Sequence, residues 1–214
     1  MRYFPVNFDV RDRKAVVVGG GKVALRKVRL LRKCGAKVTV ISPECIGTLK
    51  RMKGVKVVGR RYRTGDLHGA FLAISATDME AVNQRVCRDA TRKGIPVNVV
   101  DCPRLCTFTV PASISHGHLL MTISTGGGSP AFARRLKAGV EKLISPALIK
   151  HLDLMHEIRP AVRNSGLGLR DRMEVSRLMA GEKVTAAIRR RGVNAGRRMM
   201  KQMLARASNR RKKD

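Results

Sequence analysis

Residues 16–27 read VVVGGGKVALRK, and this stretch decides the fold. Its three consecutive valines indicate a strand with both faces buried, and three glycines follow them directly. Beyond the glycines, apolar residues recur at helical spacing until Gly35, where a helix would end. A strand that enters a helix through glycines alone can bring its backbone very close to another group. The rest of the sequence indicates which group that is.

The glycines fit a dinucleotide-binding motif, G-x-G-x-x-G/A, at Gly19, Gly21 and Ala24. In that motif Gly19 allows a tight turn, Gly21 lets the backbone approach a pyrophosphate, and Ala24 lets the helix pack closely on the strand. The pyrophosphate would lie on the unpaired N–H groups that open the helix. The alternative is a merely flexible glycine turn, but the order of strand, turn, helix and second strand favours dinucleotide binding.

The alternation of apolar runs with helical patterns continues through the first half of the chain. Strands that are apolar on both faces and alternate with helices indicate a parallel sheet covered on both sides. We therefore predict an α/β, Rossmann-like parallel sheet domain over residues 1–112. Its expected strands are 14–18, 37–41, 55–58, 70–75 and 96–100, and its expected later helices are 44–53 and 78–93, the second capped by Asp78.

The pattern changes after residue 112. A strand is expected at 119–124, then a second glycine turn, then a helix that Ser129 caps and that runs to about 144. From Ser145 onward only helical patterns remain, with breaks at Pro160, 166–168, Gly181 and Gly192, and the final SNRRKKD reads as a frayed basic tail. We expect a small α+β segment at 113–145 and a C-terminal helical domain at 146–214.

The composition is strongly basic, with 45 Lys and Arg against 15 Asp and Glu and a net charge of +30. Such a chain attracts polyanions, which leaves nucleic acid, an anionic membrane, or a small substrate rich in carboxylates or phosphates. Two Tyr, five Phe and no Trp offer few stacking platforms for single-stranded nucleic acid. No stretch is long and apolar enough to span a membrane. The five scattered cysteines suit a reducing compartment, so we expect a cytoplasmic protein.

Two acidic residues are candidates for site roles. Glu44 lies 20 residues beyond Ala24 and would reach a ribose hydroxyl, although it would serve equally as a charge at a helix N-terminus. Asp101 follows the fifth strand, at the edge where open α/β sheets bind ligands. A carboxylate there takes or gives a proton, or ligates a metal. Position alone favours an ordinary turn-forming role for Asp101.

The second glycine turn is the other candidate site. A glycine-rich turn that caps a helix N-terminus suits a carboxylate or phosphate, while a simple strand-to-helix connection is equally open. Its candidate substrate-binding residues are Thr125, Gly126, Gly127 and Ser129. Three groups of Cys or His lack metal-ligand spacing, so we predict no metal site from Cys102 with Cys106, His116 with His118, or His151 with His156.

Several motifs in a fixed order resemble the precorrin-2 dehydrogenase family, which forms the N-terminal module of siroheme synthase. Some members of that family are also sirohydrochlorin ferrochelatases. The resemblance covers about residues 1–145, while residues 146–214 match only in length and helical character. The motifs are PVNFDVRDRKAVVVGGGKVALRK at the N-terminus, ATD at 76–78, VNQRV at 82–86, NVVD at 98–101, FTVPASI at 108–114 and STGGGSPAFARRL at 124–136.

The resemblance implies NAD-dependent oxidation of precorrin-2 to sirohydrochlorin, followed in some members by Fe(II) insertion to give siroheme. It makes Asp101 the essential carboxylate, which would accept the proton that accompanies hydride loss. It also implies a homodimer interlocked by 113–145, with the strand at 119–124 near the two-fold axis. The implied cofactor-binding residues are Gly19, Gly20, Gly21, Lys22, Val23, Ala24, Pro43, Glu44, Thr77 and Asn98.

This chain departs from the family pattern at two positions, Lys22 and Thr125. Many members have an acidic or neutral residue at the first and Ser at the second, and a lysine beside the phosphates leaves NAD and NADP both open. The remaining alternative is a basic nucleic-acid-binding protein on a Rossmann scaffold, suggested by the net charge and the basic run at 189–213.

Overall fold

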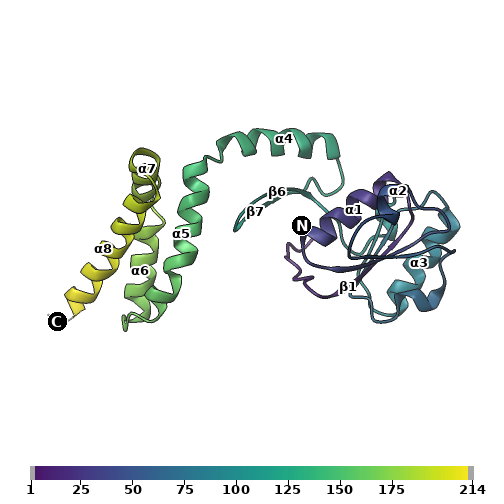
Figure 1. Cartoon of the computed structure of the whole chain (residues 1–214), viewed down its shortest axis with the longest axis horizontal. Coiled ribbons are helices and arrows are strands. Elements are labelled where there is room, and N and C mark those ends of the chain that lie inside the picture. Colours follow the sequence, from purple (N-terminus) through teal and green to yellow (C-terminus); the bar gives the residue numbers. More distant parts are fainter. Residues whose placement is uncertain (1–2, 212–214) are drawn as a thin grey trace. The chain divides into compact units, whose positions relative to one another are not determined.

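The computed structural model describes residues 3–211, and the chain divides into two compact units, Met1–Val110 and Pro111–Asp214. Figure 1 shows a sheet with helices in the first unit and mainly helices in the second. The predicted α/β, Rossmann-like class with a helical C-terminal region is confirmed. The separation of 113–145 from 146–214 stays a prediction, because both stretches belong to the second unit.

The first unit is built on a five-stranded parallel sheet in the order β3-β2-β1-β4-β5. In register, Val18 at the end of β1 lies between Ile41 of β2 and Ser75 of β4, so these three strands end at one level. Its elements are β1 Lys14–Val18, α1 Lys22–Lys33, β2 Lys37–Ile41, α2 Gly47–Lys50, β3 Val55–Val58, η1 Thr64–Leu67, β4 Leu72–Ser75, α3 Glu80–Arg92, β5 Val97–Val99 and η2 Pro103–Leu105.

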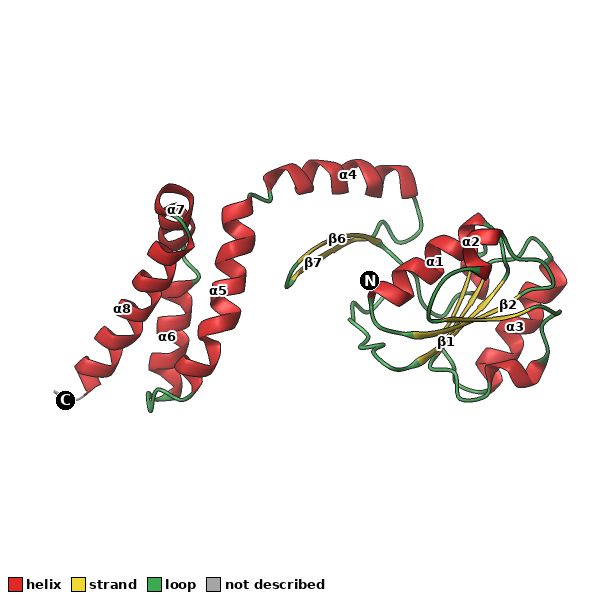
Figure 2. Cartoon of the chain, viewed as in Figure 1, coloured by secondary structure: helices red, strands yellow, loops and turns green. Residues whose placement is uncertain are grey.

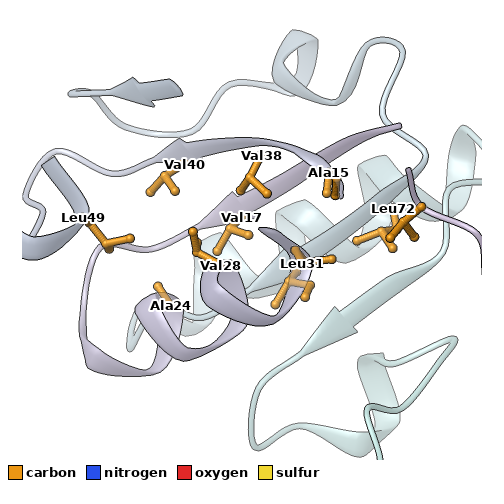
Figure 3. Close-up of a cluster of buried hydrophobic side chains, with 12 residues drawn as sticks. Ala15, Val17, Ala24, Val28, Leu31, Val38, Val40, Leu49 and Leu72 are labelled. Carbon is orange, nitrogen blue, oxygen red and sulfur yellow. The ribbon is translucent and has the colours of Figure 1, made fainter. Parts of the chain in front are cut away.

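Successive residues of each strand point alternately into two separate hydrophobic cores, one on each face of the sheet. On one face, Val17 of β1 packs with side chains of α1, including Ala24 and Val28, as Figure 3 shows. On the other face, Val16 and its neighbours pack against α3 through residues such as Val86. The unbroken apolar character of the strands thus follows from burial on both faces.

Two details of the first unit differ from the sequence prediction. The helix expected at 44–53 is reduced to α2, because the preceding loop is held on the glycine turn by a bond from Ile46 N–H to the Gly20 carbonyl at 3.0 Å. The cap expected at Asp78 is absent: Met79 is the N-cap of α3 and donates its N–H to Thr77 Oγ1 at 3.1 Å.

The second unit begins with a hairpin and continues as helices, which Figure 2 distinguishes by colour. The hairpin strands pair antiparallel, with Ala112 opposite Ile123 and His116 opposite Leu119, and α4 packs on them. The first of these strands was not expected from the sequence. The elements are β6 Ala112–His116, β7 Leu119–Ile123, α4 Pro130–Leu143, α5 Pro146–Arg163, α6 Leu169–Met179, α7 Glu182–Arg191 and α8 Val193–Arg211.

One predicted break in the helical region and the predicted fraying of the tail are wrong. Pro160 lies inside α5, three residues before its last residue Arg163, so the helix continues through the proline although one backbone hydrogen bond is lost. The basic tail expected to fray from Ser208 is helical as far as Arg211, and the rest of that stretch lies outside the described residues. The breaks at 166–168, Gly181 and Gly192 do separate helices.

A buried histidine holds the helical core together. His151 of α5 is 4% exposed; its Nδ1 lies 2.7 Å from Thr185 Oγ1 of α7, and its Nε2 lies 2.8 Å from the Met179 carbonyl at the end of α6. Both ring nitrogens therefore have partners, which a buried imidazole requires. His151 is a core residue that ties three helices, rather than a metal ligand.

We expect His151→Leu to lower the free energy of unfolding by about 1–3 kcal/mol, because it leaves the Thr185 hydroxyl and the Met179 carbonyl buried without partners. Urea unfolding of the full chain, followed by circular dichroism, measures the loss. Adding Thr185→Val should cost less than the two single changes summed, since the second change removes a group that is already unpaired. Full additivity would contradict this account.

Candidate functional site

A cleft of about 920 Å³ lies at the carboxyl ends of the strands of the first unit. The chain leaves β1 toward one side of the sheet and β4 toward the other, so the cleft stands at the topological switch point of the sheet. Its walls come from the segments after β1, β2, β4 and β5. The lining residues are Gly19, Gly20, Gly21, Lys22, Val23, Ser42, Pro43, Glu44, Cys45, Ile46, Ala76, Thr77, Asp78, Met79, Val100 and Asp101.

The glycine turn is pressed between two neighbouring loops. A Cβ on Gly19, whose φ is 119°, would fall on the Ala76 carbonyl oxygen, and a Cβ on Gly20 would fall on the Glu44 carbonyl oxygen. Backbone bonds fix the turn from the β2 side, with Gly19 N–H donating to the Ile41 carbonyl at 2.9 Å. Only glycine fits at these two positions, so the protein's own packing explains the first two glycines of the run.

Gly21 is different, because the described chain has no atom within 4 Å of a Cβ built there, apart from its direct neighbours. It is the N-cap of α1, and within the described chain no side chain caps this helix and no acidic residue stands in its first turn. The opening amides and the positive end of the helix therefore face the cleft without a partner among residues 3–211, as an anion site requires. Ala24 is fully buried against the sheet, as the motif predicts.

Pro43 and Glu44 form the rim of the cleft after β2. Ser42 Oγ donates to the Glu44 carbonyl at 2.6 Å, which tightens this loop. Glu44 is exposed and lies outside the first turn of α2, which begins only at Gly47, so the alternative of a helix N-terminal charge is wrong. A contact of Glu44 with a ribose stays a prediction.

The rim after β4 rests on a buried polar network that sequence reasoning missed. Ser75 Oγ donates to Asn83 Oδ1 at 2.7 Å, and Asn83 Nδ2 donates to the Thr77 carbonyl at 3.0 Å. Asn83 is 9% exposed and belongs to α3, so this helix holds the Thr77 segment at the cleft. The VNQRV motif contained Asn83, but only the tertiary structure gives it this function.

Asp101 lies on the rim after β5 in a left-handed conformation, with φ of 58°. This backbone conformation is rare outside glycine and costs free energy, and it gathers at functional sites. Val100 N–H donates to the Ser75 carbonyl at 2.9 Å, and this bond holds the residue after β5 against the end of β4. The exposed Asp101 carboxylate thus shares one cleft with the glycine turn, as predicted.

Asn98 does not line the cleft. Its side chain is 7% exposed, and Nδ2 donates to the Phe108 carbonyl at 3.0 Å. Cys106 Sγ, which accepts from Val99 N–H at 3.2 Å, braces the same segment, and burial raises the pKa of its thiol. Asn98 therefore supports the loop that carries Asp101 rather than facing a ligand.

Lys27 is a second residue that the sequence did not single out. It lies on α1, one turn beyond Val23, and is half-buried. Burial lowers the pKa of Lys27, the neighbouring Arg26 lowers it further, and the Cys106 and Asp101 groups oppose this shift. Lys27 and the Asp101 carboxylate are therefore near enough for their charges to attract each other.

The second glycine turn belongs to the second unit, and hydrogen bonds between its own residues and the start of α4 hold it in place. Ser129 Oγ accepts from Phe132 N–H at 3.2 Å and caps α4, while Ser129 N–H donates to Thr125 Oγ1 at 3.1 Å. Gly126 and Gly127 have φ of 64° and 92°, which explains why glycine stands there. The substrate-binding role predicted for these four residues stays a prediction.

Residues 3–211 contain no group of three or more His, Cys, Asp or Glu side chains placed to hold a metal ion. All five cysteines are free thiols. Within the same residues, no helix combines the length and the apolar character that a membrane span needs.

Comparison with known proteins agrees with this site. Residues 6–112 match the family described as "Putative NAD(P)-binding", and the chain belongs to this family of nicotinamide-dinucleotide-binding domains. The matched residues contain every lining residue of the cleft. The cleft and the open end of α1 therefore have the residues that a dinucleotide diphosphate needs.

Two of the relatives found by sequence comparison have the name siroheme synthase. The chain is 42% identical to the siroheme synthase of Methylobacillus flagellatus over 166 residues, which cover 76% of this chain and 36% of that protein. It is 40% identical to the siroheme synthase of Nitrosomonas eutropha over 167 residues, 76% of this chain and 35% of that protein. The chain thus spans about a third of the length of these relatives. None of the relatives named here supports the nucleic-acid alternative.

A solved structure of SirC, a precorrin-2 dehydrogenase, has a similar fold, with a TM-score of 0.77 and 22% sequence identity. The likeness covers 95% of this chain and 100% of that structure. It therefore extends beyond the dinucleotide domain and includes the hairpin and the helices of the second unit.

We expect Gly21→Ala to weaken NAD binding about tenfold or more without lowering thermal stability, because the added methyl enters space that no described part of the chain uses. Calorimetric titration and a melting curve measure the two effects. Gly59→Ala is the matched control, since Gly59 also has open space around it but lies outside the cleft. Unchanged NAD affinity in Gly21→Ala would contradict this location of the diphosphate.

Proposed function

We propose that this protein oxidises precorrin-2 to sirohydrochlorin, with NAD as the hydride acceptor. The observation that carries the proposal is the position of Asp101, a carboxylate held in a left-handed conformation on the same cleft as the glycine turn and the uncapped end of α1. The family provides the cofactor class, and the names of the relatives and of SirC provide the substrate.

Each wall of the cleft has a distinct task in this reaction. The backbone of Gly19, Gly20 and Gly21 and the first turn of α1 would hold the diphosphate, and Glu44 would bind a ribose. Bound NAD supplies the acceptor for a hydride that leaves a saturated carbon of the macrocycle. Asp101 takes the accompanying proton, so two electrons and two hydrogens leave precorrin-2 in total. Lys27 places a positive charge near the Asp101 carboxylate.

The charge of the protein suits this substrate. Precorrin-2 carries many carboxylates, and a protein of net charge +30 draws such a molecule in and holds it by long-range attraction. The free cysteines agree with a reducing cytoplasm as the place of this chemistry.

A second step, insertion of Fe(II) into sirohydrochlorin to give siroheme, is part of the proposal. Fe(II) is a substrate in this step, and Asp101 would collect the pyrrole protons that the metal displaces. Anaerobic incubation with sirohydrochlorin and Fe(II) tests the step separately from oxidation. A rate equal to the uncatalysed rate would remove chelation and leave the dehydrogenase intact.

We also propose that the protein acts as a homodimer through the hairpin and α4. Two strands alone make a marginal sheet, and β6 and β7 pair only with each other among the described residues. Large apolar side chains stand exposed on the same elements: Leu120 at 52% and Met121 at 36% on β7, and Phe132 at 43% and Leu136 at 40% on α4. A second copy would cover these side chains and pair with a free strand edge.

Asp101→Ala should lower kcat for NAD-dependent oxidation of precorrin-2 by about 100-fold or more, because the proton then lacks its acceptor. Anaerobic assays with enzymatically made precorrin-2 measure NADH and sirohydrochlorin by absorbance. NAD affinity should hardly change, since the diphosphate is held elsewhere in the cleft.

Asp12→Ala is the matched control for the backbone. Asp12 has the same φ of 58°, is exposed, lies outside the cleft, and pairs with Lys37 at 3.3 Å. It should cost as much stability as Asp101→Ala and leave turnover unchanged. An Asp101→Ala protein with full activity would remove the proposed function.

Leu120→Glu combined with Leu136→Glu should convert the dimer to a monomer, because each buries a charge in the proposed interface. Sedimentation velocity measures the mass. Leu169→Glu is the control: Leu169 is 69% exposed but belongs to α6, and so to neither the hairpin nor α4. Monomeric wild-type protein, or equal effects of both changes, would contradict this interface.

A further inference from the structure

The second unit contains a cavity of about 690 Å³ that the proposed reaction has not used. It lies between α5, α6 and the turn of the β6–β7 hairpin, and we call it the arginine cavity. Its residues are His118, Leu152, Met155, His156, Ile158, Arg159, Val162, Arg163, Arg172, Ser176 and Met179.

The cavity has a cationic lining without acidic partners. Its titratable side chains are three arginines and two histidines, with no carboxylate among them. The acidic residues of α5 and α6 are Asp153, Glu157, Asp171 and Glu174, and none of them lines the cavity. Like charges gathered in one hollow repel one another, so an anion that enters relieves this repulsion.

The arginines of the cavity contrast with another arginine of the same bundle. Arg197 of α8 makes two bonds to Glu157, with Nε to Oε1 at 3.0 Å and Nη2 to Oε2 at 2.9 Å. Among the described residues, by comparison, the side chains of Arg159 and Arg163 have no ion pair or hydrogen bond. Within residues 3–211, the bundle therefore supplies a carboxylate to Arg197 and none to the cavity.

Arg172 gives the clearest sign that an acceptor is missing. It is half-buried, and the one side-chain bond that it makes within the described chain runs from Nη1 to the Arg163 carbonyl at 3.3 Å. Its Nε is the one side-chain nitrogen or oxygen in the described residues that is buried without any partner. A guanidinium with so little compensation is stabilised by a nearby anion, for which its planar fork is well suited.

The rest of the lining defines the body of the ligand. Leu152, Met155, Ile158, Val162 and Met179 supply apolar lining, and the rings of His118 and His156 lie with centroids 3.9 Å apart. Gly117, with φ of 54°, brings the hairpin turn onto α5 and so places His118 there. A small inorganic anion would leave the apolar wall uncovered, whereas a flat apolar body with acid groups would contact both.

We propose that the arginine cavity binds an organic polycarboxylate with a flat apolar body, through Arg159, Arg163 and Arg172. This is the chemistry of the tetrapyrrole polycarboxylates, and the assignment of that natural ligand rests on the proposed function. The second unit would then hold acid side chains of the macrocycle in addition to its part in the dimer.

Binding of uroporphyrin to the full chain, followed by porphyrin absorbance and fluorescence, tests the proposal. Arg159→Gln with Arg163→Gln should weaken binding about tenfold or more, because two charge-assisted bonds are lost. Arg170→Gln with Arg177→Gln removes the same charge from exposed positions of α6 outside the cavity and should change affinity less than about twofold.

Ser176→Trp tests the cavity without changing charge, because the indole would fill it from the α6 side and should also reduce binding. Equal losses in the two arginine pairs would show general attraction to a basic protein and overturn the proposal. So would unchanged affinity in the cavity variants, or displacement of uroporphyrin by an equal concentration of inorganic phosphate.

NAD affinity, measured on every variant, should stay at the wild-type value, because the cleft lies wholly in the first unit. A wild-type protein that fails to oxidise precorrin-2 would remove the proposed function and leave the uroporphyrin result to stand alone. A protein that oxidises precorrin-2 normally but shows no effect of the cavity variants on uroporphyrin binding would overturn only the arginine cavity.

Discussion

Close backbone packing at the start of α1 is the constraint on which the rest of the first unit depends. Gly19 touches the segment after β4, and Gly20 touches the segment after β2, so three strand ends meet around one turn. The same packing aims the uncapped amides of α1 into the cleft. Because parallel strands bring all their carboxyl ends to one edge, the Thr77 segment and Asp101 arrive at the same place. The dinucleotide site is thus a consequence of how this sheet is wound.

The parts of the fold that depend on local pattern could be predicted from the sequence. The strands 14–18, 37–41 and 55–58 were placed correctly because β-branched runs bounded by glycines and turns have few alternative structures. The helix expected at 44–53 failed because a tertiary bond from Ile46 to the glycine turn competes with helix formation there. The strand β6 was missed because ASISH is largely polar and becomes a strand only by pairing with β7.

In the candidate site, too, the residues fixed by local sequence pattern could be predicted, and those that depend on tertiary contacts could not. The glycine turn and Asp101 could be predicted, because a motif and a strand end each fix a residue's place in a wound sheet. Asn98 was assigned to the cofactor because its motif ends at Asp101, yet residues alternate along a strand and its side chain turns to Phe108 instead. Asn83, Lys27 and the arginine cavity could not be predicted, since each acts through neighbours distant in sequence.

The two units use positive charge in different ways, and this difference explains why a basic protein need not bind nucleic acid. In the first unit, the partial charge of a helix end is open to a ligand while Asp101 lines the same cleft, which suits an enzyme that must also move a proton. In the second unit, full charges on Arg159, Arg163 and Arg172 surround a hollow with an apolar wall. Nucleic acid would need a row of cations along an open surface. Cations gathered around an apolar hollow fit a compact, acid-bearing molecule better.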